Sequence, residues 1–156
     1  MSLMATYQLV GYNWDHWTNK YVSRVTRSKI NHVSIRVTPC GGAPNELYCS
    51  AYPTDTWVPT SVVERLNGQA TWTSRHYPID FADLVALKED ARWWRETEPA
   101  SITHSLYYHY LGRYIGGKVP YTCTYMCSRA LNRMGVHVAE EFYPNRLIQD
   151  FIMEVY

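Results

Sequence analysis

The chain has 156 residues, of which 46% are hydrophobic, and it carries a formal net charge of +1 from 15 basic and 14 acidic side chains. This length suits one domain with a core of its own, and the composition excludes a disordered chain. The balanced charge argues against a nucleic-acid partner, which would show as a basic excess. We expect a single domain over residues 4–156, with residues 1–3 as an expression remnant.

No stretch approaches the roughly 20 apolar residues that a membrane span needs. The N-terminus lacks the charged region and long apolar run of a signal peptide. We therefore expect no integral membrane segment and a cytoplasmic location, with a phage-encoded or virion-associated protein as an open alternative. In such a chain Cys40, Cys49, Cys123 and Cys127 are expected to be free thiols.

The first third of the chain predicts strands. Residues 7–10 indicate a short strand, whereas the aromatic-rich segment 14–26 is ambiguous and compatible with a short helix. Residues 30–37 alternate between apolar and polar side chains, which is typical of a half-buried strand. The Pro and Gly residues over 39–44 predict a turn, and 46–51 indicates the return strand of a hairpin.

Helical signals begin after Pro59. Ser61 and Glu64 fit a capping box, and Gly68 is a natural stop. Asp80 is placed to cap the next helix, and the segment between them, 69–78, could hold one further strand.

The last third predicts helices. An apolar stripe runs over 106–114, a helix is expected from Thr122 or Cys123 to Gly135, and Pro144 opens a final amphipathic helix. Strands followed by helices predict an α+β fold, with an antiparallel sheet packed by helices.

Cys123 is the strongest candidate for chemistry. A helix start presents unpaired N–H groups and a partial positive charge, which favour a thiolate and can hold an oxyanion. The alternative is a buried structural thiol. Cys127 lies one turn further on and is expected in the core.

His32 is the candidate general base. Its side chain lies on the polar face of the predicted strand, and imidazole has a pKa near neutrality, as a base for a thiol requires. The alternative is a surface or hydrogen-bonded core histidine.

A zinc site built from Cys123, Cys127 and either His32 or Cys49 is a weaker prediction, because neither C-x-x-C nor H-E-x-x-H is present. Walker A, G-x-G-x-x-G and G-x-S-x-G motifs are absent as well, so the sequence predicts no cofactor.

The stretch 30–37, Ile-Asn-His-Val-Ser-Ile-Arg-Val, resembles the histidine strand of the NlpC/P60 superfamily of papain-like hydrolases. The stretch 121–126, Tyr-Thr-Cys-Thr-Tyr-Met, running on to Leu131 and Gly135, resembles its cysteine helix. Because the histidine strand comes first here, the order is similar to that of the circularly permuted branch, which includes YiiX-like and lecithin retinol acyltransferase-like proteins.

The resemblance implies a permuted papain-like fold and a thiol-dependent peptidase, amidase or esterase. Its substrate would be a peptide, a cell-wall amide or a lipid ester. Cys123 would be the nucleophile, His32 the base, and Ser50 the residue that orients the imidazole, with Cys49 or Glu46 in that role if the register shifts. Because Ser50 would orient the ring only weakly, a catalytically weak or inactive binding module is the alternative.

Overall fold

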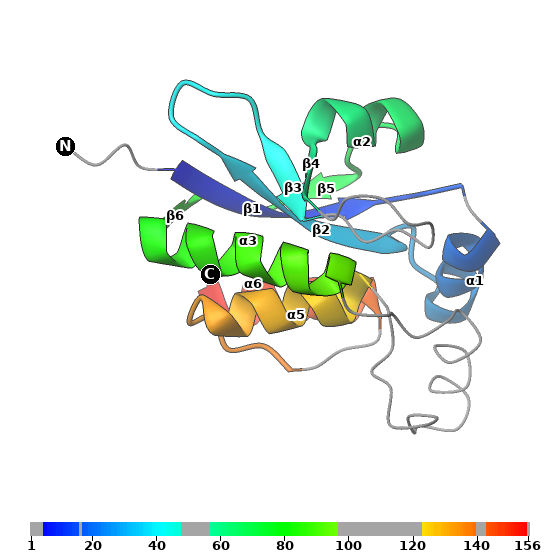
Figure 1. Ribbon diagram of the computed structural model, residues 1–156. Coiled ribbons are helices and arrows are strands. Elements are labelled where there is room, and N and C mark those ends of the chain that lie inside the picture. The colour runs from blue at the N-terminus through cyan, green and yellow to red at the C-terminus, as the bar shows by residue number, and fades with distance from the viewer. Residues whose placement is uncertain (1–4, 16, 48–56, 97–122, 140–142, 156) are drawn as a thin grey trace.

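The computed structural model describes residues 5–15, 17–47, 57–96, 123–139 and 143–155. Its centre is an antiparallel sheet of six strands in the order β4-β3-β2-β1-β5, with β6 also paired to β1 (Figure 1). The strands are β1 (Ala5–Tyr12), β2 (His32–Thr38), β3 (Asn45–Leu47), β4 (Trp57–Pro59), β5 (Trp72–Thr73) and β6 (Tyr77–Ile79). The first strand of the chain is therefore a central strand of the sheet.

Five helices accompany the described sheet. They are α1 (Trp17–Thr26), α2 (Thr60–Asn67), α3 (Phe81–Glu96), α5 (Cys123–Arg133) and α6 (Pro144–Val155). Figure 1 shows α3, α5 and α6 together on one side of the sheet, which we call the helical face, and α2 on the other side, which we call the α2 face. The mixed α+β class and the antiparallel sheet packed by helices are confirmed.

The alternation of β2 divides its side chains between these two faces. Val33, Ile35 and Val37 are buried in the main core, together with residues of α3, α5 and α6. A smaller apolar cluster of Val10, Tyr12, Trp14 and Val63 lies on the α2 face. The register that pairs Tyr12 with His32 puts those two side chains on the same face of the sheet.

Most expected element boundaries agree with the structure. Asp80 caps α3 through its Oδ1, which accepts a hydrogen bond from the Asp83 N–H at 2.8 Å. Gly68 ends α2 with its N–H bonded to the Glu64 carbonyl, as expected. The prediction of a capping box at Ser61 and Glu64 is wrong, because α2 begins at Thr60 after Pro59 and has no side-chain cap.

One other expectation changes in detail, because two short strands, β5 and β6, follow Gln69 where one strand was expected. The ambiguous segment 14–26 contains α1, in agreement with the short helix that the sequence allowed. The apolar stripe over 106–114 lies outside the described residues.

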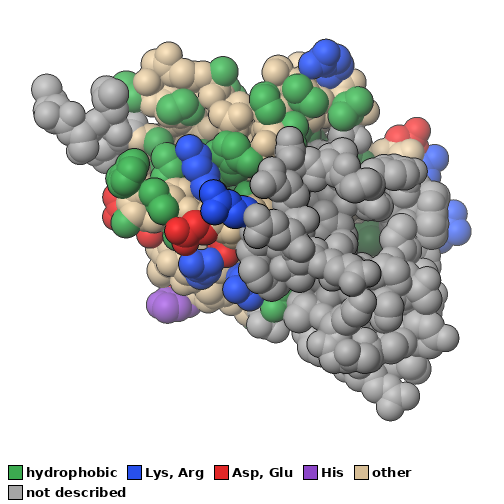
Figure 2. All heavy atoms as spheres, in the orientation of Figure 1, with side chains coloured by type: hydrophobic (Ala, Val, Ile, Leu, Met, Phe, Trp, Pro, Cys, Tyr) green, Lys and Arg blue, Asp and Glu red, His purple; other side chains and the backbone are tan. Residues whose placement is uncertain are grey.

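The described surface mixes charges of both signs. Figure 2 shows Lys/Arg and Asp/Glu side chains close together over α3 and α5. Across these two helices, the Arg133 guanidinium lies 3.9 Å from the Glu89 carboxylate. Within the described residues, no helix has the length and apolar character that would let it cross a membrane.

Candidate functional site

Cys123 is the first residue of α5, as the sequence predicts. It is half-buried and packs against the core on the helical face. The backbone of Val33 lies within hydrogen-bonding reach of its sulfur. One turn later, Cys127 donates its S–H to the Val33 carbonyl at 3.7 Å. The helix start is therefore fixed against the residue that follows His32 in β2.

The electrostatics of the thiol differ from the sequence-based expectation. Burial raises the pKa of Cys123, and this effect outweighs the lowering by hydrogen bonds from Val33, Thr124 and the Cys123 backbone itself. The helix start presents N–H groups, but burial of the thiol favours its neutral form over a resting thiolate. A neutral thiol that acts as a nucleophile needs a base to accept its proton.

His32 opens β2 and is only 2% exposed. Its imidazole stacks on the Trp14 indole, with ring centroids 3.4 Å apart and an interplanar angle of 16°, and the Tyr12 ring centroid lies 6.1 Å away. Burial lowers the pKa of His32 to about 3, so the ring is neutral at pH 7. The imidazole thus faces the α2 face, whereas the Cys123 thiol packs on the helical face.

The structure consequently brings Cys123 next to the backbone of the histidine strand, but it does not show the imidazole bonded to the sulfur. In the described part of the chain, the sulfur has Thr124 Oγ1 at 3.9 Å as its side-chain neighbour. The catalytic roles of Cys123 and His32 stay predictions.

Asn31 fixes the loop that carries Trp14. Its Oδ1 accepts a hydrogen bond from the Trp14 N–H at 2.8 Å, and its Nδ2 donates to the Trp14 carbonyl at 3.1 Å. The same Nδ2 donates to Ser23 Oγ of α1 at 3.0 Å. One buried amide therefore holds both backbone groups of the residue that covers His32.

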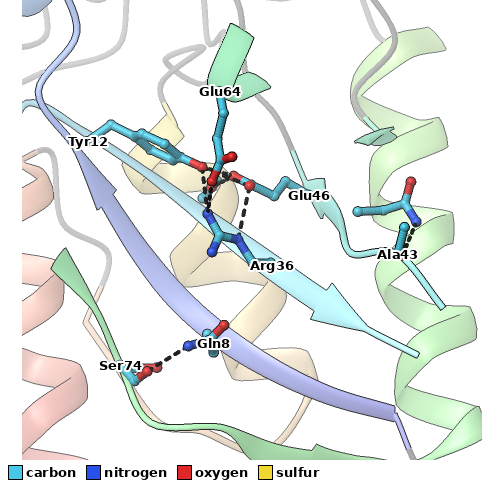
Figure 3. Close-up of polar contacts among 9 residues, drawn as sticks. Gln8, Tyr12, Arg36, Ala43, Glu46, Glu64 and Ser74 are labelled. Carbon is cyan, nitrogen blue, oxygen red and sulfur yellow. Dashed lines mark hydrogen bonds and ion pairs between the residues drawn. The ribbon is translucent and has the colours of Figure 1, made fainter. Parts of the chain in front are cut away.

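A buried carboxylate lies farther along the same face. Glu46 is fully buried and accepts hydrogen bonds from the Tyr12 hydroxyl at 2.6 and 2.7 Å and from the Ser34 hydroxyl at 2.5 Å. Arg36 Nε donates to it at 3.2 Å, and Arg36 also reaches Glu64 of α2 at 3.5 Å (Figure 3). The partners of Glu46 are thus Tyr12, Ser34 and Arg36, rather than the imidazole that it would orient as third catalytic residue.

Sequence reasoning missed three residues of this region. Tyr12 and Trp14 meet Glu46 and His32 through strand pairing and a loop, and Asn31, although next to His32 in the chain, shows its role only through its bonds to Trp14. The one sequence signal for them is that the aromatic end of β1 pairs with the strand 30–37, so its side chains can share a face with the polar ones of that strand. Ser50 and Cys49, the other two candidates for the third catalytic position, lie outside the described residues.

The far end of α5 is anchored by charge. Asp90 of α3, which is 1% exposed, bonds to Arg133 and has the Arg129 Nε at 3.8 Å. Burial raises the pKa of Asp90, while both arginines oppose this shift. Helix α5, and with it the position of Cys123, is therefore held to α3 as well as to β2.

Within the described residues, no group of three or more His, Cys, Asp or Glu side chains is arranged to hold a metal ion. Scans for related proteins gave no match to any family model. Searches of curated proteins and of solved structures also found none that matches this chain.

Proposed function

We propose that the chain is a thiol-dependent hydrolase of amide or ester bonds, of the permuted NlpC/P60 type, with Cys123 as nucleophile and His32 as base. The observation that carries this proposal is the position of Cys123 at the start of α5, with its sulfur against the backbone of the residue next to His32. In this proposal Cys123 is the nucleophile, the N–H groups of the helix start hold the oxyanion, and His32, which precedes Val33 in the chain, is the base.

The pKa directions favour one form of the mechanism. A neutral thiol and a neutral imidazole suit general-base catalysis better than a resting thiolate–imidazolium pair. The imidazole takes the S–H proton as sulfur bonds to the substrate carbonyl carbon, and it returns the proton to the leaving amine or alcohol as the C–N or C–O bond breaks. Water then hydrolyses the thioester. This route requires the imidazole to leave Trp14 on the α2 face and to turn at the start of β2 towards the sulfur, which packs on the helical face.

The proposal is tested by measuring the alkylation rate of Cys123 from pH 6 to 10, resolved from other cysteines by mass spectrometry. We expect the rate at pH 7 to fall at least tenfold in His32→Ala and to be unchanged in Cys127→Ser. Hydrolysis of peptide, cell-wall amide and lipid ester substrates should be lost in Cys123→Ser. If alkylation ignores His32 and no substrate is turned over, the hydrolase proposal is overturned.

A catalytically inactive binding module is the second candidate. This candidate is favoured by the orientation of the His32 imidazole, which stacks on Trp14 and does not point to the Cys123 sulfur. This candidate predicts that Cys123→Ser leaves the protein's biological function intact, whereas loss of turnover in that variant would exclude it.

A further inference from the structure

We infer that Trp14, clamped by Asn31, is a positioning residue that holds the His32 imidazole in a dry resting orientation and so controls its availability as a base. This inference depends on the proposed hydrolase for its catalytic consequence. Its physical content, the state of the imidazole, can be measured without any turnover.

The Trp14 indole stacks face to face on the His32 imidazole. A centroid distance of 3.4 Å at 16° leaves no room for water between the two rings. Trp14 is 5% exposed and His32 is 2% exposed, so both rings are shielded from solvent and the indole covers one face of the imidazole. An imidazole covered in this way cannot hydrate a positive charge, and its neutral form is favoured.

The Asn31 side chain holds Trp14 in this position. Both backbone groups of Trp14 bond to the Asn31 side chain, at 2.8 and 3.1 Å. Asn31 directly precedes His32, so the covering residue and the covered residue are tied to the same point of β2. The indole is thus held over the imidazole by geometry specific to this loop, and Asn31 also connects the unit to Ser23 of α1.

Other charged or titratable groups face this region and must be separated from the effect of the stack. They are Tyr12 on β1, Arg36 on β2, Glu46 on β3 and Glu64 on α2, with Cys123 of α5 near the following residue. The charges of Arg36 and Glu46 neutralise each other, and the Tyr12 hydroxyl donates its hydrogen bond to Glu46. Among the described residues, the Trp14 indole stacks face to face on the imidazole, whereas the charged groups named above contact one another.

The experiment is an NMR titration of His32 from pH 5 to 8 in ¹³C,¹⁵N-histidine-labelled protein, with its signals assigned by their loss in His32→Gln. In the unmodified protein we expect ring protons shifted upfield by the indole and no titration above pH 5. In Trp14→Leu, which keeps apolar volume but removes the flat ring, the upfield shift should vanish and a midpoint should enter the window, a rise of at least two pH units.

Two controls isolate the cause. Trp57→Leu removes an indole packed against the main core, and Tyr12→Phe removes the hydroxyl bonded to Glu46 while keeping the ring. Neither should bring the His32 midpoint above pH 5. A folded Trp14→Leu protein in which His32 still does not titrate would overturn the inference. Absence of the upfield shift in the unmodified protein would do so even if the variant fails to fold.

Cys123 alkylation at pH 7, measured in the same variants, distinguishes this inference from the proposed function. If Trp14→Leu raises the rate in a His32-dependent way, both stand. If the His32 midpoint moves but alkylation ignores His32, the positioning role stands and the hydrolase proposal fails. If alkylation depends on His32 but the midpoint ignores Trp14, the hydrolase stands and the positioning role fails.

Discussion

The Glu46→Gln substitution tests the buried network on the α2 face. The carboxylate has no exposed surface and accepts hydrogen bonds from three donors, the Tyr12 and Ser34 hydroxyls and the Arg36 Nε–H. Glutamine keeps the size but has one acceptor oxygen, and its amide N–H groups would face existing donors. Arg36, whose side chain is only 14% exposed, would lose its buried counter-ion. Breaking such a pair from one side costs about 3 kcal/mol, at the lower end of the usual range because Glu64 stays near Arg36.

The measurement is urea unfolding followed by circular dichroism. With a slope of about 2 kcal/mol per molar urea, the midpoint should fall by about 1.5 M without a change in slope. Glu64→Gln is the matched control, because Glu64 contacts the same arginine at 3.5 Å but its side chain is 36% exposed, so its loss should cost less than about 1 kcal/mol. Equal and small midpoint shifts in the two variants would refute the reasoning.

Three further predictions concern stability. Burial lowers the folded-state pKa of His32 to about 3, so below pH 6.5 the unfolded chain binds more protons than the folded chain. The free energy of unfolding should therefore fall by about 2 kcal/mol from pH 6.5 to 5. Urea midpoints measured at these two pH values should show a smaller loss in His32→Gln, and an equal loss would contradict this role of His32. Gly135→Ala should cost about 1 kcal/mol, since Gly135 follows α5 with φ +86°; thermal unfolding with no decrease in Tm would be the contrary result. Gly11→Ala should cost about 1–3 kcal/mol, because its Cβ would lie 2.9 Å from Ile30 and 3.2 Å from Ile148; chemical denaturation checks this, and an unchanged midpoint would mean that both side chains move aside freely.

Local patterns predicted the elements of this fold well. Period-two alternation in 30–37 and the stop and cap residues Gly68 and Asp80 act over a few residues, so they can be recognised without tertiary information. The start of α5 at Cys123 follows from the same kind of signal. Pro59 displaced the expected capping box because its fixed φ already suits the residue before a helix start.

The site could be predicted only in part. Sequence indicated Cys123 and His32 separately, but strand alternation alone could not show which sheet face each helix would cover. The direction of the Cys123 pKa shift was missed for a similar reason, because burial depends on the packed core and not on the helix start. Trp14 and Asn31 act across a loop closure that no short pattern encodes.

The central position of β1 has a consequence for how the chain folds during synthesis. Its partners β2, β5 and β6 are all made later, and α6, the last described helix, also packs against it. Strand β1 must therefore wait for segments made much later, α6 included, before its helical side is covered, as expected for a topology with many long-range contacts.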